Sequence, residues 1–314
     1  MEFITIDKEK IRKGSNAFIE LDIARLPSGT SINLPVHVFR SKVDGPVLLL
    51  SGGLHGDEVN GIETVRRIVE NKLLHRIKCG SVIAVPIINI YGFLNFSRDV
   101  PDGKDVNRSF PGNESGSLAS YVAYTLTNKI LPNITMGLDF HTGGASRTNY
   151  PQIRFAGEDK NAAELAHAFA PPFVLKSPVI NNSLREQAFK MGKSIVVYEG
   201  GESLRFDEFA ISEAIKGAER VMKHFGMIRT AQKPRKTVFL ESSQWVRAEV
   251  SGLFRLIKRS GQLVKKGEII GLINGPASRY EAPVESPVDG HIIGHNNIPV
   301  VHRGDALFNI GVHR

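Results

Sequence analysis

Apolar residues in this chain first follow a two-residue period and then form continuous runs. Residues 16–40 alternate apolar and polar positions around Pro27-Ser28-Gly29, which predicts a β-hairpin. Unbroken apolar runs bounded by glycine then predict buried strands within 47–50, 81–90, 134–140 and 194–198. Amphipathic segments predict helices at 62–73, 117–131, 159–170 and 203–225. Strands that alternate with helices predict an α/β fold, with a mostly parallel or mixed sheet and helices on both faces.

The pattern changes again after Met227. Residues 230–236 are polar and basic and contain Pro234, so we expect a linker between a first domain, 1–229, and a second domain, 237–314. Beyond the linker, strand and turn patterns recur, and residues 250–270 are echoed by 288–307. This repeat resembles the hammerhead barrel of lipoyl and biotinyl carrier domains. The segment between the halves, 274–283, has no lysine for a carrier to modify. We therefore expect a small all-β, barrel-like structural domain.

Composition narrows the class of protein. The chain has 314 residues, 41% hydrophobic and 23% charged, as is usual for globular proteins. Cys79 is the single cysteine, which excludes an internal disulfide and predicts a cytoplasmic location. No apolar run approaches the roughly 20 residues that cross a bilayer, so we expect no membrane partner. The net charge of +8 is dispersed and lacks interleaved aromatic residues, so we expect small anionic substrates rather than nucleic acid.

Polar residues at the ends of the predicted strands indicate a metal site. His55 and Glu58 follow the run 47–50 in a glycine-rich turn, and His141 follows 134–140. In α/β sheets, ligands bind beyond the carboxyl ends of the strands. Two histidines and one carboxylate are the three protein ligands of a hydrolytic zinc site. Each residue also has an ordinary interpretation, since Glu58 suits the first turn of a helix and His141 suits a packed histidine.

Other polar residues are candidates for catalysis and substrate binding. Glu199 directly follows the apolar run 194–198. A carboxylate at this position is suited to take a proton from water and return it to the leaving amine. Its neighbour Glu202 is interpreted as the acidic residue that opens the next helix. Asn107 and Arg108 form either a clamp for a substrate carboxylate or a surface turn. Asp139 shares a strand face with His141 and is expected to support it, unless it is an ordinary strand-end aspartate.

Taken together, these motifs resemble those of the succinylglutamate desuccinylase/aspartoacylase family, in the zinc carboxypeptidase-like group. The resemblance covers about residues 30–225 and rests on the following segments: His55-Gly56-Asp57-Glu58, Asp105-Val106-Asn107-Arg108-Ser109-Phe110-Pro111-Gly112, Asp139-Phe140-His141-Thr142-Gly143, and Glu199. It implies one zinc ion per chain, bound by His55, Glu58 and His141. It also implies Glu199 as the catalytic carboxylate, Asn107 with Arg108 as binders of the substrate α-carboxylate, and Asp105 as a residue that orients a ligand histidine.

One position departs from the family pattern. Aspartoacylase-type members have an arginine seven positions before the asparagine, where this chain has Val100, and Arg98 is near but not aligned. The stretch around Asp102-Gly103 instead resembles deacetylases of N-acetylated diamino acids. This likeness implies a small, uncharged acyl group.

The expected function is therefore that of a zinc-dependent amidohydrolase, which hydrolyses the amide bond of an N-acyl amino acid. Arg154 is a further candidate for substrate binding, together with Arg147. One alternative is a zinc metallocarboxypeptidase, whose substrate presents the same carboxylate. Another is a non-catalytic adaptor or carrier acting through residues 237–314. The sequence determines neither the acyl group, nor the amino acid, nor whether the chain forms a homo-oligomer.

Overall fold

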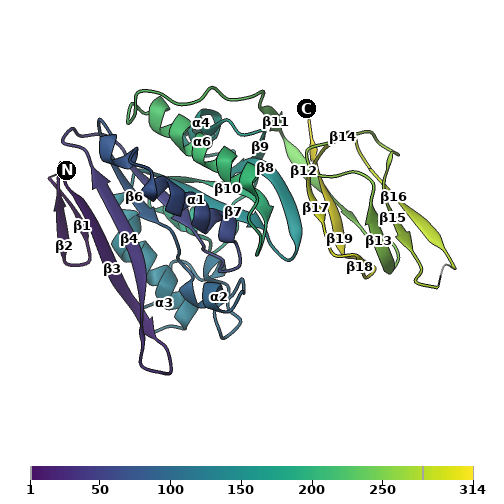
Figure 1. Cartoon of the computed structure of the whole chain (residues 1–314), viewed down its shortest axis with the longest axis horizontal. Helices are drawn as coiled ribbons and strands as arrows, with labels where there is room; N and C mark the ends of the chain where they lie inside the picture. The colour runs from purple at the N-terminus through teal and green to yellow at the C-terminus, as the bar shows by residue number, and fades with distance from the viewer. Residues whose placement is uncertain (1, 278, 314) are drawn as a thin grey trace.

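A mixed sheet runs through the molecule (Figure 1), and 13 strands belong to it among the described residues. The computed structural model describes residues 2–277 and 279–313. The main path of the sheet comprises, in spatial order, β3 (Asn16–Arg25), β4 (Ser31–Arg40), β6 (Ser81–Val85), β5 (Val47–Gly52), β7 (Met136–Gly143), β10 (Ser194–Glu202), β8 (Arg147–Phe155), β17 (Gly290–Asn296), β19 (Ala306–Val312) and β12 (Ser242–Arg247). The central strands β6, β5, β7 and β10 are parallel to one another, and antiparallel strands extend the sheet on both sides.

Shorter strands and the helices complete the chain. The remaining strands of the sheet are β9 (Phe173–Lys176), β11 (Val238–Leu240) and β14 (Leu263–Val264). Smaller sheets contain β1 (Phe3–Ile6) with β2 (Glu9–Arg12), and β16 (Glu281–Glu285), β15 (Ile269–Asn274), β13 (Gly252–Leu256) and β18 (Val300–Val301). The helices are α1 (Val59–Glu70), α2 (Ile90–Leu94), α3 (Leu118–Thr125), α4 (Lys160–Phe169), α5 (Leu184–Lys190) and α6 (Glu208–His224), with short turns η1 (Leu74–Arg76), η2 (Val106–Arg108), η3 (Leu126–Ile130) and η4 (Leu131–Asn133).

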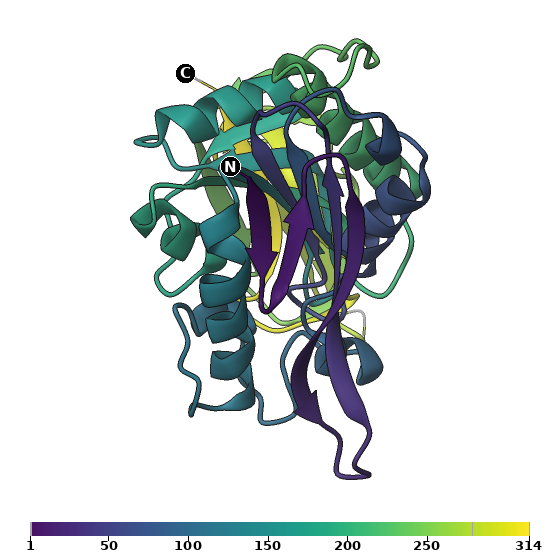
Figure 2. The ribbon, with the colours of Figure 1, turned by 90° about the vertical axis from the view of Figure 1, so that its left-hand side faces the viewer.

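Helices cover both faces of the parallel part of the sheet (Figure 2). Alternate residues of β5 show the division, since Leu48 and Leu50 join one buried cluster and Leu49 joins the other. The first cluster includes buried residues of α1, α4 and α6, and the second includes residues of α3 and α5. The predicted α/β fold with helices on both faces is confirmed. Among the described residues, no helix is long and apolar enough to cross a membrane.

Several predicted boundaries were wrong, and local chemistry explains them. The predicted strand 81–90 stops at Val85, because Pro86 has no backbone N–H for a sheet. The predicted helix 203–225 begins only at Glu208, where the Asp207 carboxylate accepts the N–H of Ala210 at 3.0 Å. Glu202 was expected to open this helix, but it is the last residue of β10.

The sequence did not predict the strands β8 and β9 or the helix α5. In β8 the polar residues Arg147, Asn149, Gln152 and Arg154 interrupt the apolar pattern. The short α5 has an N-cap at Ser183, whose hydroxyl accepts the N–H of Glu186. These segments lie between the predicted ones and are held by contacts with neighbouring strands and helices.

The C-terminal part is all-β, as predicted. Residues 230–237 have no regular secondary structure, which suits the linker expected at 230–236. The strand β17 pairs with β8, with Gly294 opposite Asn149, so the large sheet continues from the α/β part into the C-terminal part. A separate apolar cluster, which includes Phe254 and Phe308, fills the interior between the C-terminal strands. The proposed domain limits themselves stay a prediction.

Candidate active site

The turn between β5 and α1 brings His55 and Glu58 together. Gly53 has a positive φ of 59°, and a Cβ atom at Gly56 would lie 2.0 Å from the carbonyl carbon of Gly92, so these two positions require glycine. The helix α1 starts directly after Glu58. Within this turn, His55 Nδ1 lies 2.8 Å from Glu58 Oε1, and both side chains are buried.

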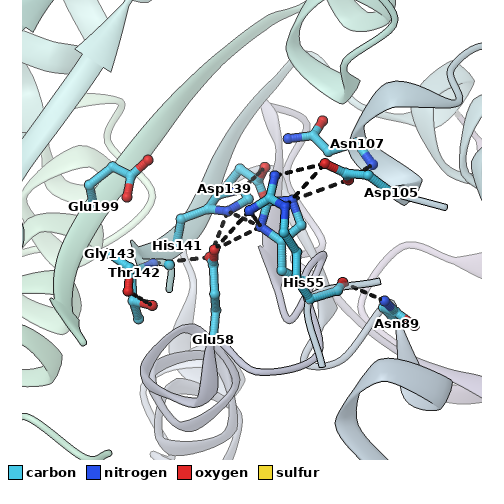
Figure 3. A network of polar contacts seen from close by, with 12 residues as sticks. His55, Glu58, Asn89, Asp105, Asn107, Asp139, His141, Thr142, Gly143 and Glu199 are labelled. Carbon is cyan, nitrogen blue, oxygen red and sulfur yellow. Dashed lines mark hydrogen bonds and ion pairs between the residues drawn. The ribbon is translucent and has the colours of Figure 1, made fainter. Parts of the chain in front are cut away.

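The strand β7 brings the second histidine to the same place. His141 Nδ1 lies 2.8 Å from Glu58 Oε2, which also accepts the N–H of Thr142 at 3.0 Å. On the other side of the ring, His141 Nε2 lies 2.7 Å from Asp139 Oδ2. The hydroxyl of Ser51 on β5 donates to Asp139 Oδ1 at 2.7 Å, which fixes this carboxylate. Figure 3 shows the resulting network.

These three side chains have the chemistry of a zinc site. One ligand atom from each of His55, Glu58 and His141 lies within 4.8 Å of the others, and all three residues are buried. The two Nδ1 atoms are 3.2 Å apart. The Nε2 atoms face carboxylates, with Asp105 Oδ1 at 3.3 Å from His55 and Asp139 at His141. Histidines whose second nitrogen meets a carboxylate are typical of zinc centres, so the residues fit this metal.

The electrostatics of the cluster also favour a cation. Burial opposes every charge here, but the neighbouring carboxylates outweigh it and raise the pKa of both imidazoles, for His141 well above its usual value. Burial likewise opposes ionisation of Glu58, yet the two imidazoles hold the pKa of its carboxyl below the usual range. The pKa of Asp105 is lowered in the same way by His55 and Arg98. The cluster therefore stabilises positive charge at its centre.

Arg98 is part of this network, although it does not align with the arginine of the family pattern. Its guanidinium donates to Asp105 Oδ2 at 2.7 Å, and its Nη1 lies 3.2 Å from His55 Nδ1 and 3.6 Å from Glu58 Oε1. Val100, at the position expected for the family arginine, is instead buried in the apolar core. The loop that contains Arg98 thus supplies an arginine to the site from a different position in the sequence.

Asn107 and Arg108 also line the cavity at this site. Asp105 caps the turn η2, because its Oδ1 accepts the N–H of Asn107 at 2.7 Å. The Oδ1 atom of Asn107 accepts the N–H of Leu184 at 3.0 Å, which holds the amide in place. Arg108 Nη1 donates to the carbonyl oxygen of Asn107 at 2.7 Å, and its side chain remains partly exposed. The pair therefore combines one fixed amide with one accessible guanidinium.

Glu199 lies across the site from the metal-ligand candidates (Figure 3). It is paired with His141 in the parallel register of β10 with β7. Asn149 Nδ2 donates to Glu199 Oε2 at 2.9 Å, and Arg154 Nη1 lies 4.0 Å from Oε1. All these side chains line one cavity of about 230 Å³. This position is suited to a carboxylate that exchanges protons with a molecule in the cavity.

The cavity also contains residues that the sequence analysis missed. Arg185 of α5 is buried, and its Nη1 has no hydrogen-bond partner within the described parts of the chain. Burial and the adjacent Arg154 lower the pKa of Arg185 to about 10. Its Nη2 donates to the carbonyl oxygen of Pro178 at 2.6 Å, so the free Nη1 remains available and favours an anionic ligand. No sequence signal indicated this residue, since α5 itself was not predicted.

Trp245 reaches the cavity from the C-terminal part of the chain. It lies on β12, and the Arg147 guanidinium carbon is 5.7 Å from the centre of its ring system. The C-terminal strands therefore form part of the cavity wall.

The structure brings the residues proposed from the sequence together at this cavity. Those that line it are His55, Glu58, Asn107, Arg108, Asp139, His141, Arg154 and Glu199. Asp105 does not line the cavity itself but contacts two residues that do, His55 and Arg98.

Known proteins share both the sequence pattern and the fold. Residues 44–225 match the succinylglutamate desuccinylase/aspartoacylase catalytic domain. The chain is 29% identical over 310 residues to N-alpha-acetyl-L-2,4-diaminobutyric acid deacetylase of Halomonas elongata, with 93% of this chain and 90% of that protein covered. The product-bound structure of the ectoine utilization protein EutE (DoeB) from Ruegeria pomeroyi is similar, with a TM-score of 0.84, 24% identity and 95% of each chain covered. A succinylglutamate desuccinylase/aspartoacylase from Rhodobacter sphaeroides has a TM-score of 0.84, 24% identity and 94% coverage of each chain.

The family match and the deacetylase relative indicate an amide hydrolase, and the His/Glu/His cluster beyond the central strands of the sheet is its candidate metal centre. The chain belongs to the succinylglutamate desuccinylase/aspartoacylase family, as the match over 44–225 shows. The resemblance found in the sequence motifs is thereby confirmed.

Proposed function

We propose that this protein is a zinc-dependent deacylase, which hydrolyses an N-acyl amino acid to a free amino acid and a carboxylic acid. The observation that carries the proposal is the small cavity of about 230 Å³, in which His55, Glu58 and His141 face Glu199. Of the arginines that the structure describes, five line the same cavity, namely Arg98, Arg108, Arg147, Arg154 and Arg185. Such a positive, confined space suits a small substrate with a carboxylate.

The residues divide the reaction between them. Zinc bound by His55, Glu58 and His141 would supply Lewis acidity, polarising the amide carbonyl and lowering the pKa of water. Glu199 takes a proton from the attacking water and transfers it to the amide nitrogen as the C–N bond breaks. The hydroxyl group of the water molecule ends on the carboxylic acid and its proton on the amine, so the reaction consumes one water molecule.

Other residues hold the substrate and the metal ligands. Asn107 and Arg108 bind the α-carboxylate of the amino acid, with one amide and one guanidinium as donors. Arg154 and Arg185, on the Glu199 side of the cavity, add positive charge for the same anionic substrate. Asp105 and Asp139 orient the imidazoles of His55 and His141, respectively.

A small acyl group is the first choice for the substrate. The relative from Halomonas elongata carries the name of an N-alpha-acetyl-L-2,4-diaminobutyric acid deacetylase, and it aligns with almost the whole chain. This likeness, together with the Asp102-Gly103 stretch, supports an acetylated amino acid. The family name also supports succinyl and aspartyl compounds as candidates.

The test is hydrolysis of a substrate panel by the full chain loaded with zinc. The panel contains N-acetyl-2,4-diaminobutyrate, N-acetylaspartate and N-succinylglutamate, and the released amine is measured. We expect hydrolysis of at least one N-acyl amino acid with one zinc ion per chain. No hydrolysis of any such compound by the zinc-loaded chain would contradict the proposal.

The alternative as a carboxypeptidase is less well supported, because Trp245 of the C-terminal part helps to wall the cavity. An N-acyl dipeptide is the discriminating substrate. Its cleavage at a rate similar to that of the N-acyl amino acids would favour a peptidase. The carrier alternative would require a modified side chain, and mass spectrometry of the protein purified from its host would reveal a lipoyl or biotinyl adduct.

A further inference from the structure

We infer that Asn149 is a positioning residue for Glu199 and that the C-terminal strand β17 holds Asn149 in place. This inference rests on the catalytic role proposed for Glu199. It gives the C-terminal part of the chain a function in the reaction, through one hydrogen bond and one close backbone contact. Neither Asn149 nor any residue of β17 belongs to the motifs from which the family resemblance was drawn.

The backbone around Glu199 leaves its side chain in need of support. The register of β10 with β8 shifts between Glu199 and Gly201, and the register with β7 shifts between Glu199 and Glu202. Such irregularities bend a strand and redirect a side chain. The carboxylate is then fixed by Asn149, whose Nδ2 donates to Oε2 at 2.9 Å and which is itself buried.

An amide is chemically suited to this task. It donates a hydrogen bond without adding a charge, so it orients the carboxylate while weakening it less as a base than a cation at the same distance would. Arg154 Nη1, at 4.0 Å from Oε1, lies beyond hydrogen-bond distance. The amide of Asn149 must also face the right way, since a flipped amide would place its oxygen against the carboxylate.

The strand β17 provides the space that this orientation needs. Gly294 pairs with Asn149 in the antiparallel register of β17 with β8. A Cβ atom at Gly294 would lie 2.6 Å from Asn149 Oδ1, which is too close for any real contact. With Oδ1 above this glycine, Nδ2 points to Glu199. A side chain at position 294 would therefore displace the amide and, with it, the carboxylate.

The first test compares the variants Asn149→Ala and Asn149→Asp in the zinc-loaded full chain, with the substrate that the panel identifies. We expect kcat to fall about 10- to 100-fold, with KM and the zinc content close to those of the wild type. Asn149→Asp places a second carboxylate beside Glu199. Like charges raise the pKa of a carboxyl, so the acidic limb of the kcat/KM profile should move to higher pH in this variant.

The second test isolates the contact with β17. Gly294→Ala should lower kcat about 10-fold in the wild-type background and have no further effect in Asn149→Ala, where the clashing side chain is absent. Asn297→Ala is the matched control, because it removes a different hydrogen bond between the same regions, from Asn297 Nδ2 to Thr148 Oγ1 at 2.8 Å. We expect kcat of this control to equal that of the wild type. An equal additional loss from Gly294→Ala in both backgrounds would contradict coupling through Asn149.

The outcomes separate this inference from the proposed function. If Glu199→Gln retains full activity, the catalytic role of Glu199 fails. If Glu199→Gln is inactive while Asn149→Ala keeps the kcat and the pH profile of the wild type, only the positioning role fails. Crystal structures of the wild type and of Asn149→Ala test the inference independently of activity. The Glu199 side chain should change its rotamer in the variant, and an unchanged carboxylate position would overturn the inference.

Discussion

Glu199 lies directly opposite His141 in the parallel pairing of β10 with β7. The two residues come from separate strands of the chain, yet the sheet register makes them neighbours. Paired residues of adjacent strands project to the same face, so the carboxylate and the imidazole reach the same cavity. This register explains how one side of the cavity carries a candidate metal ligand and the other a candidate proton-transfer group.

Replacing Glu199 by Gln should remove most activity and leave zinc bound. The amide of Gln cannot accept a proton from water, so kcat should fall about 10²- to 10⁴-fold. The measurement is the rate of amine release together with the zinc content per chain. Loss of zinc from this variant would show that Glu199 supports the metal instead.

Replacing Asp139 by Asn should weaken zinc binding about 10- to 100-fold, because His141 loses the carboxylate that orients its ring. Competition with a chelator measures the affinity. Asp159→Asn is the matched control, since Asp159 is also a buried aspartate with a serine partner, accepting from Ser194 Oγ at 2.8 Å, but it caps α4. The control should lower the free energy of unfolding and leave zinc affinity unchanged, whereas equal zinc loss in both variants would contradict this role.

Replacing Arg185 by Gln should raise KM for a substrate with a carboxylate by about 10- to 100-fold, which corresponds to a lost charged hydrogen bond. Steady-state kinetics should show a much smaller change in kcat. Arg220 is equally buried and, like Arg185, donates to a backbone carbonyl oxygen, that of Phe169 at 2.7 Å, but it does not line the cavity. Arg220→Gln is therefore the control, and an equal effect on KM would assign the change to stability.

Replacing Trp245 by Ala should open the cavity to larger substrates. The side chain is partly exposed on an edge strand, so its removal is expected to disturb folding little. We expect new hydrolysis of N-acyl dipeptides in rate assays, while Trp245→Phe should keep the selectivity of the wild type. If dipeptides remain excluded in the alanine variant, other residues set the size of the cavity.

Replacing His295 by Asn should reduce the loss of stability at acidic pH. Burial, together with the positive charge of Arg259, lowers the pKa of His295 to about 4, and its Nδ1 accepts the N–H of Ser260 at 3.1 Å. The unfolded chain binds this proton near pH 6.5, so stability is present above that pH and is lost as the pH falls from about 6.5 to 4. The shift corresponds to a loss of about 2 kcal/mol between pH 7 and pH 5.

Urea unfolding at these two pH values measures the effect. The wild type should lose about 2 kcal/mol more than His295→Asn over this interval, while the difference between the two proteins should stay constant above pH 7. An identical pH dependence in both proteins would contradict a lowered pKa for His295.

The sequence predicted the parts of the fold whose signals are local. Continuous apolar runs marked β5, β7 and β10, because strands buried on both faces need apolar residues throughout. The end of β10 was missed, so Glu202 was assigned to the start of the next helix instead of to the strand. The apolar period of α6 does not show where the strand ends, and the helix begins only after its cap at Asp207. The strand β8 was missed since its polar residues serve a cavity and conceal the strand pattern.

The sequence by itself determined the family, the α/β class and four residues of the site, namely His55, Glu58, His141 and Glu199. These residues sit at strand ends or in glycine-rich turns, where short-range spacing carries the information. Only the tertiary structure decided that Arg98, Arg185, Asn149 and Trp245 share that cavity. Their positions depend on sheet register and on packing between segments far apart in the chain, and no local pattern encodes such contacts.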